Sequence, residues 1–79
     1  MTAADVLFPR LSQEQPDAEG VLATWFVGDG DMVAQSQLIG EVMVEKVSGD
    51  VHAPTAGRVH LLVAEDQTAR QGQVIARIE

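Results

Sequence analysis

The chain contains no cysteine and no tyrosine, and its only aromatic residues are Phe8, Trp25 and Phe26. Without cysteine it can form neither a disulfide framework nor a thiolate metal site. At 79 residues we expect one domain, near the lower size limit for a stable core. Its stability must come from apolar packing, which a hydrophobic content of 46% permits. Valine, leucine, isoleucine and alanine therefore have to fill the interior.

Basic residues are also scarce, with five lysines and arginines against twelve aspartates and glutamates and a net charge of −7. This balance argues against binding nucleic-acid phosphates, which calls for clustered cations, and against an anionic membrane surface. It favours partners with basic docking faces. No targeting segment is visible, because residues 1–5 lack a basic region and the apolar run 6–8 is too short. We expect a cytoplasmic protein, or one of an organelle matrix if a targeting segment has been removed.

The chain has a single lysine, Lys46, and its other cationic side chains are arginines. A lysine amine can be acylated to a neutral amide, whereas a guanidinium stays protonated and is a poor nucleophile. Lys46 lies in a strand–turn–strand pattern over residues 38–51, where a hairpin would carry it into solvent. The first hypothesis is covalent attachment of a group to Lys46. The alternative is an ordinary solvated turn lysine.

Valine-rich segments interrupted by glycine predict an all-β fold of short strands, and no window shows a sustained helical period. The predicted strands are 4–8, 20–27, 37–44, 47–52, 57–63 and 73–79, with shorter ones near 32–34 and 68–70. In the strand before Lys46, alternation predicts that Leu38, Val42 and Val44 face the core. Met43 should then face outward.

An internal repeat appears when residues 33–42 are shifted by 36 positions onto residues 69–78. Identities occur at Gln35/Gln71, Gln37/Gln73 and Ile39/Ile75. Two copies of one β unit predict a pseudo-two-fold structure in which each half buries its apolar face against the other. Chance similarity between short β segments is the alternative. In the two-fold arrangement Lys46 lies at the turn between the halves.

Several segments in order carry a resemblance to a known family. They are Phe8-Pro9-Arg10-Leu11-Ser12, Gly20 to Val27, Gly30-Asp31-Met32-Val33, Leu38 to Lys46, Ala53-Pro54-Thr55-Ala56-Gly57-Arg58-Val59 and Gly72 to Ala76. Lys46 follows Gly30 by sixteen residues and precedes Gly57 by eleven. Over residues 6–79 the chain resembles the lipoyl domain (biotinyl/lipoyl attachment) family.

The resemblance implies a fold and a role. The fold is a flattened β-barrel of two four-stranded antiparallel sheets, with both termini at one end and the modified lysine at a hairpin tip at the other. Residues 1–79 would then be a single carrier domain with no catalytic residue and no metal site. Lys46 would carry lipoate in amide linkage, and Glu45 and Val47 beside it would take part in recognition. The loop at 11–19 would lie near the lysine tip.

The resemblance also implies partners. A lipoate ligase or transferase would load Lys46. The arm would then take up an acyl group at a thiamine-dependent 2-oxo acid dehydrogenase, pass it to coenzyme A at the acyltransferase, and be reoxidised by dihydrolipoyl dehydrogenase. Such a domain belongs either to the amino-terminal part of an acyltransferase or to a free-standing carrier.

Two alternatives remain open. Biotin carriers of carboxylases usually have methionine on both sides of the lysine, whereas here the neighbours are Glu45 and Val47, and Met43 is three residues earlier. This difference favours lipoate over biotin. The second alternative is an unmodified structural or interaction module on the same fold. His52 and His60 lack zinc-ligand spacing, and Trp25 is interpreted as a packing residue.

Overall fold

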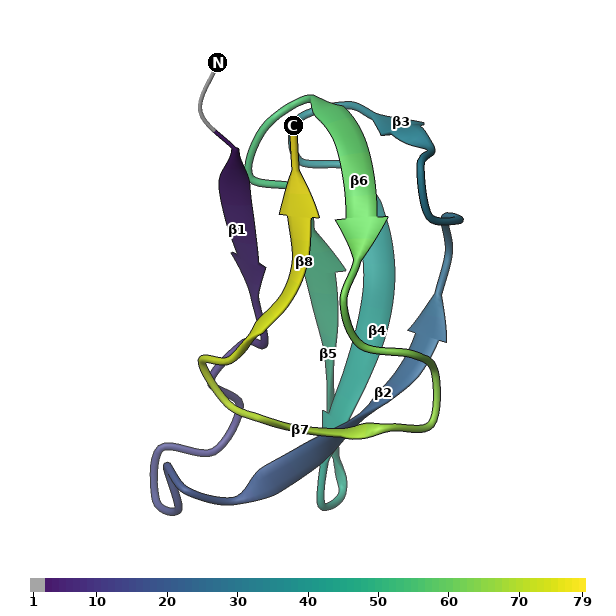
Figure 1. Cartoon of the computed structure of the whole chain (residues 1–79). Helices are drawn as coiled ribbons and strands as arrows, with labels where there is room; N and C mark the ends of the chain where they lie inside the picture. Colours follow the sequence, from purple (N-terminus) through teal and green to yellow (C-terminus); the bar gives the residue numbers. More distant parts are fainter. Residues whose placement is uncertain (1–2) are drawn as a thin grey trace.

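The computed structural model describes residues 3–79, which form eight strands and no helix (Figure 1). The strands are β1 (Ala4–Leu7), β2 (Glu19–Trp25), β3 (Met32–Val33), β4 (Leu38–Val44), β5 (Val47–His52), β6 (Gly57–Leu61), β7 (Thr68–Arg70) and β8 (Val74–Ile78). All eight predicted strands are present, with ends that differ by at most two residues. No helix long and apolar enough to span a membrane occurs among these residues.

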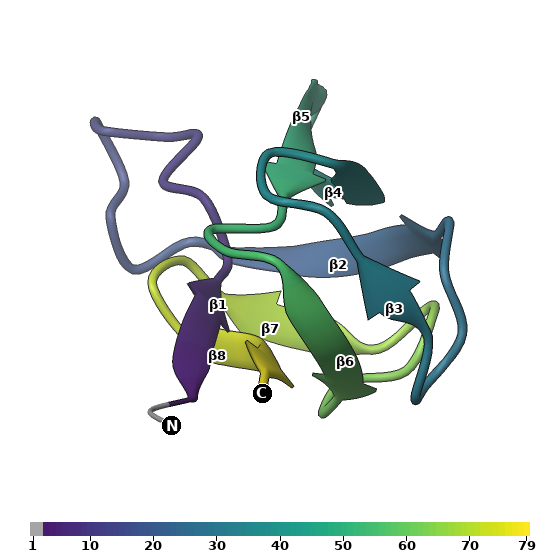
Figure 2. The same cartoon turned by 90° about the horizontal axis from the view of Figure 1, so that it is seen from above.

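The strands form two four-stranded sheets, in the orders β1-β8-β6-β3 and β5-β4-β2-β7. Every paired neighbour runs antiparallel. Figure 2, seen from above, shows the strands surrounding a common interior. The molecule is elongated, with extents of 36 × 21 × 18 Å. The predicted fold class is therefore confirmed.

A shift of 36 residues carries β3 onto β7 and β4 onto β8, so one sheet maps onto the other strand for strand. The turn hydrogen bonds repeat at the same interval. The Ala34 N–H donates to Gln37 Oε1 at 2.8 Å, and the Arg70 N–H donates to Gln73 Oε1 at 3.0 Å. The repeat in the sequence thus corresponds to a pseudo-two-fold axis in the structure, and chance similarity does not explain it.

The same symmetry appears in two carboxylates that lie on connections between strands. The Trp25 N–H donates to Glu65 Oε2, and the Leu61 N–H donates to Asp29 Oδ1, each at 2.8 Å. Both donors and both acceptors are 36 residues apart. Each carboxylate therefore satisfies a backbone donor at the end of a strand, where the ladder no longer supplies a partner.

The interior is aliphatic apart from one phenylalanine. The buried apolar residues are Val6, Phe8, Leu22, Val33, Ile39, Val42, Val44, Val51, Ala53, Val59, Val63, Ala69, Ile75, Ala76 and Ile78. They come from both sheets and from the connections between them. The composition had predicted such a core, and burial of these side chains supplies the main stabilisation in a chain without disulfides.

One predicted core position in β4 is wrong. Val42 and Val44 are buried and Met43 faces outward, as predicted, but Leu38 is 40% exposed and Ile39 is fully buried. The register between β4 and β5 shifts between Leu38 and Gly40. A bulge at that point reverses the alternation of side chains, because one extra residue moves the following side chains to the opposite face.

Candidate functional site

Lys46 lies in a two-residue turn between β4 and β5, whose last pair is Val44 with Val47. Figure 1 shows this hairpin at the lower end of the molecule, opposite the chain ends. Glu45, the first turn residue, has φ of 55°. A positive φ at this position matches the right-handed twist of the flanking strands. The turn is therefore short and fixed in register.

The Lys46 side chain projects into solvent, and Glu45 beside it is exposed as well. No carboxylate among residues 3–79 lies within ion-pair distance of its ammonium. Below the tip, Val44 is only 1% exposed, so the hairpin is anchored in the core, whereas Val47 is 51% exposed. An amine at an exposed and anchored tip fits a group held by an amide bond, because nothing in the fold obstructs the nitrogen.

The loop between β1 and β2 runs beside this hairpin, and we refer to its residues 11–18 as the 11–18 loop. A groove of about 500 Å³ separates the two. The residues that line it are Leu11, Ser12, Gln13 and Glu14 from the loop and Val44, Glu45 and Val47 from the hairpin. The predicted position of the loop near the lysine tip is confirmed for residues 11–14.

Leu11 fixes the near end of the loop on β5. An added Cβ at Gly49 would lie 2.5 Å from Leu11 Cδ2, so the Leu11 side chain packs directly on the backbone of β5 at this glycine. Leu11 also packs against the hydrophobic core, as does Ala18 at the far end of the loop. Both ends of the 11–18 loop are therefore held by apolar contacts.

Between these ends the loop is held by Gln71, the one buried polar side chain in the described part of the chain, at 7% exposure. Its Oε1 accepts the Ser12 N–H at 2.7 Å. Its Nε2 lies 3.0 Å from Gln15 O, 3.4 Å from Pro16 O and 3.3 Å from Ala18 O. In the sequence Gln71 stands out only as the repeat partner of Gln35. No sequence signal distinguishes the two glutamines, so this role was missed.

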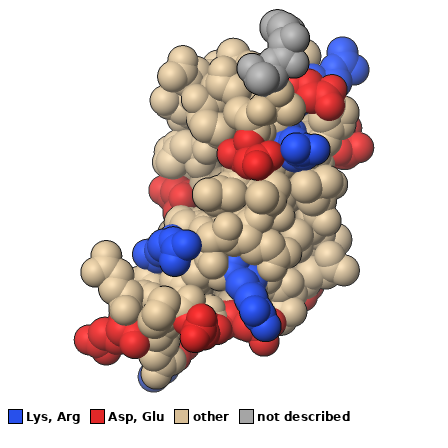
Figure 3. Space-filling model, turned by 60° about the vertical axis from the view of Figure 1, so that its left-hand side comes forward, with Lys and Arg blue, Asp and Glu red and all other residues tan. Residues whose placement is uncertain are grey.

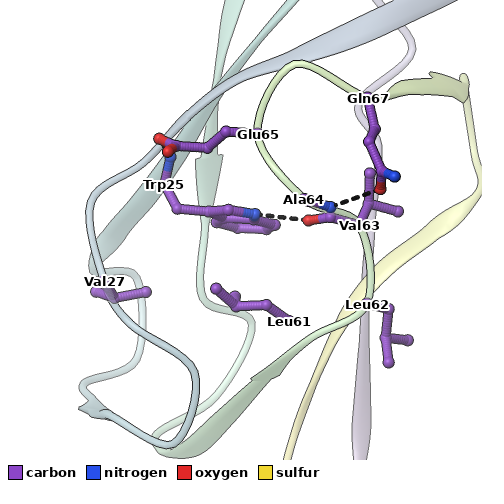
Figure 4. A pocket seen from close by; sticks show the side chains of 8 residues that line it. All are labelled: Trp25, Val27, Leu61, Leu62, Val63, Ala64, Glu65 and Gln67. Atoms are coloured by element: carbon purple, nitrogen blue, oxygen red, sulfur yellow. Dashed lines mark hydrogen bonds between the residues drawn. The ribbon is translucent and has the colours of Figure 1, made fainter.

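A second hollow, of about 480 Å³, lies away from the hairpin beside Trp25 (Figure 4). Its polar groups are already used within the protein. The Trp25 indole Nε1–H donates to Val63 O at 2.8 Å, Glu65 accepts the Trp25 N–H, and Gln67 accepts the Ala64 N–H at 2.9 Å. Trp25 packs against the core as predicted, and this hollow is a feature of packing.

The two histidines lie away from the hairpin tip, and each contacts a different residue. His52 Nδ1 is 3.0 Å from Ser36 O, and His60 Nε2 is 3.4 Å from the Glu79 carboxylate. Within residues 3–79 no three potential metal ligands group together. On the face that Figure 3 shows, acidic side chains lie in both the upper and the lower parts with basic ones among them, and the lower group lies at the end that carries the hairpin.

Comparisons with known proteins agree with this geometry. The family model described as "Biotin-requiring enzyme" matches residues 8–78. The chain is 34% identical, over its full length, to the lipoamide acyltransferase component of the branched-chain alpha-keto acid dehydrogenase complex of Bacillus subtilis. It is 38% identical, over 96% of its length, to the dihydrolipoyllysine-residue acetyltransferase component of the pyruvate dehydrogenase complex of Corynebacterium glutamicum. These matches span only 18% and 11% of the two relatives.

A solved structure is similar throughout. The solution structure of the lipoyl domain of the 2-oxoglutarate dehydrogenase complex from Azotobacter vinelandii superposes with a TM-score of 0.75 at 25% identity, over 96% of both chains. The family match covers nearly the whole chain, and the relatives exceed 30% identity. The chain therefore belongs to the biotin/lipoyl attachment domain family.

Proposed function

We propose that residues 1–79 form a non-catalytic carrier domain of a 2-oxo acid dehydrogenase complex, with lipoate attached to Lys46 through an amide bond. The observation that carries the proposal is the placement of the only lysine at an exposed two-residue turn. The similar lipoyl domain and the relatives named as components of such complexes support it.

The chain's own residues act as a support. The Val44–Val47 pair holds the turn, and the buried Val44 side chain connects the turn rigidly to the core. Lipoate, when bound, supplies a disulfide that is reduced as an acyl group is taken up. The attachment reaction joins Lys46 Nζ to the lipoate carboxyl carbon, the activating group on that carboxyl leaves, and the ligase removes the protons that the nitrogen loses. Tethering then raises the effective concentration of the carried group at each partner enzyme.

The proposed partners follow from this role. A lipoate ligase or transferase loads Lys46, and a thiamine-dependent dehydrogenase, an acyltransferase and a dihydrolipoyl dehydrogenase act on the loaded domain. Glu45 and Val47 are the proposed recognition residues, because they flank Lys46 and both line the groove beside it. The acidic surface near the hairpin (Figure 3) suits basic docking faces on these proteins.

A biotin carrier is the second candidate function, since the matching family model is described by biotin-requiring enzymes. The lysine turn would serve that role in the same way, through an amide to the biotin carboxyl group. Glu45 and Val47 beside Lys46 favour lipoate, as argued from the sequence.

Intact-mass measurement tests both candidates. The chain is co-expressed in turn with a lipoate ligase and with a biotin ligase, and Lys46→Arg is the matched control. We expect a lipoyl-sized increment that disappears in Lys46→Arg. We also expect the free energy of unfolding of this variant to lie within about 0.5 kcal/mol of that of the parent, because an exposed turn side chain contributes little to packing. A biotin-sized increment would exclude the lipoate assignment, and no increment with either ligase would favour an unmodified module.

A further inference from the structure

Gln71 is the one residue outside the 11–18 loop that forms hydrogen bonds to residues 12–18 in the described part of the chain. The other bonds of this segment are internal, such as Gln15 N–H to Ser12 Oγ at 3.2 Å and Ala18 N–H to Gln15 O at 2.9 Å. A single amide thus accepts from one end of the loop and donates to the other. The side chain is 7% exposed and its hydrogen bonds to the loop are partly buried, so its loss would remove partners that water replaces only in part.

The pseudo-symmetric partner of Gln71 shows that the barrel itself does not need this burial. Gln35 occupies the equivalent place 36 residues earlier, between Ala34 and the positive-φ residue Ser36, and it is exposed to solvent. The two turns otherwise share the same hydrogen bonds. The difference is that the 11–18 loop covers Gln71, so the role of Gln71 concerns the loop.

The loop in turn forms one side of the groove beside the lysine hairpin. Residues 11–14 face the hairpin across the groove, and carboxylates stand on both sides of it, Glu14 on the loop and Glu45 on the hairpin. Glu45 is the residue next to Lys46 in the turn, and Glu14 lies across the same groove. The paired carboxylates suit a basic face on that protein.

We propose that Gln71 is a positioning residue, which holds the 11–18 loop against the Lys46 hairpin so that a lipoate ligase recognises loop and hairpin as one surface. This inference rests on the proposed function. Gln71 acts through the loop and does not touch Lys46 or the group that it carries. The loop is already ordered before the ligase binds, so binding does not lose the conformational entropy of ordering it.

Amide hydrogen exchange of the unmodified chain tests the positioning step independently of any ligase. Gln71→Leu keeps a side chain of similar size but removes both the acceptor and the donor, and Gln35→Leu is the matched control. We expect the Ser12 amide to exchange at least about tenfold faster in Gln71→Leu, while amides in the centre of β4 keep their protection. Gln35→Leu should change neither. Retained protection at Ser12 in Gln71→Leu would overturn the inference.

Ligase kinetics with the unmodified chain as substrate test the recognition step. We expect Gln71→Leu to raise KM for the chain about tenfold with kcat nearly unchanged, which is the signature of lost ground-state recognition. Gln35→Leu should leave both constants unchanged. Trinitrobenzenesulfonate, a small amine reagent, should react with Lys46 at the same rate in all three proteins, because the amine itself is not altered.

The outcomes separate the two proposals. If the parent chain is never lipoylated, the proposed function fails. If the parent is lipoylated and Gln71→Leu has the parent KM despite fast exchange at Ser12, the inference fails and the proposed function stands. If Gln71→Leu does not fold, Gln71→Glu replaces it. That side chain can still accept from Ser12 N–H but cannot donate to the loop carbonyls, and we expect the same direction of change in exchange and in KM.

Discussion

The segments that lead into β2 and into β6 occupy equivalent places in the two sheets, yet they differ in length. Their starting points correspond because the Gly72 N–H donates to Phe8 O at 2.9 Å and the Ser36 N–H donates to Ala53 O at 2.8 Å. Gly72 and Ser36 are 36 residues apart. Phe8 and Ala53 are therefore the symmetry-related positions from which each connection sets out.

From Phe8 the chain takes fourteen residues to reach the buried Leu22 of β2, whereas from Ala53 it takes six to reach the buried Val59 of β6. The additional residues make the 11–18 loop beside Lys46. The barrel is thus nearly symmetric, and the features with a proposed function are the ones that break its symmetry. The following experiments test how far the equivalence of the two sheets extends.

The largest expected effect concerns the equivalent glycines Gly20 and Gly57, at the start of β2 and β6. A Cβ on Gly20 would overlap the Phe8 ring and lie 2.6 Å from Met43 O, and a Cβ on Gly57 would overlap Glu79 O. Gly57 also has φ of 151°, which alanine rarely adopts. We expect Gly20→Ala and Gly57→Ala each to lower the free energy of unfolding by about 3 kcal/mol.

Urea denaturation of both variants measures this loss, and Gly28→Ala is the control. At Gly28 the nearest atom to an added Cβ is Asp31 Oδ2 at 3.5 Å, an ordinary contact. A Gly57→Ala variant as stable as the parent, beside a destabilised Gly20→Ala, would show that the two sheets are not packed alike at this point.

An intermediate effect should appear where the sheets differ by a compensating pair. Trp25 pairs with Gly40 across β2 and β4, and Leu61 pairs with Ala76 at the equivalent place across β6 and β8. A Cβ at Gly40 would lie 2.9 Å from Trp25 Cε3. We expect Gly40→Ala to cost about 2 kcal/mol in the parent, because the indole has no room for the methyl group.

The same substitution should cost less than about 0.5 kcal/mol in a Trp25→Leu background, since the first sheet then copies the second. A double-mutant cycle on unfolding free energies measures the coupling, expected at about 1.5 kcal/mol. If Gly40→Ala lowers the free energy of unfolding equally in the two backgrounds, the glycine at position 40 is not required by the Trp25 indole.

The smallest effect concerns the turns, where each symmetric pair combines a glycine with another residue at positive φ. Ser36 has φ of 68° against 84° for Gly72, and Asp66 has 69° against 89° for Gly30. We expect Ser36→Gly to stabilise the chain by about 0.5 kcal/mol, because relief of the left-handed conformation exceeds the entropy lost with glycine. Asp66→Gly should be close to neutral, since aspartate tolerates this conformation better. Urea midpoints of the two variants check the order, and destabilisation by Ser36→Gly would contradict it.

The strands and the two-fold relation could be predicted from the sequence because local patterns determine them. Valine-rich alternation gave all eight strands, and the matching glutamines at 35/71 and 37/73 marked equivalent turns. In these turns Gln37 and Gln73 bond to backbone N–H groups three residues earlier. A contact between residues three positions apart can be recognised from their spacing in the sequence.

The errors arise where the outcome depends on distant segments. Alternation predicts Leu38 in the core because it assumes an unbroken ladder, and nothing in residues 37–44 indicates the bulge opposite β5. In the sequence Gln71 resembles Gln35 because each is followed two residues later by a second matching glutamine, Gln73 or Gln37. Its burial results from residues 12–18, which are more than fifty positions away. At the candidate site, Lys46 could be singled out by its uniqueness, but the loop contacts beside it required the structure.

Ala4 pairs with Ile78, so the start of β1 lies beside the end of β8. The two-fold axis relates this end of the barrel to the end that carries the Lys46 hairpin, and we call the two ends its poles. A short peptide joining these strands would recreate a hairpin there. Opening the chain in another exposed connection would give a circular permutant with the same barrel. Copying Glu45-Lys46 into the new turn would then place an attachment lysine at each pole of one molecule.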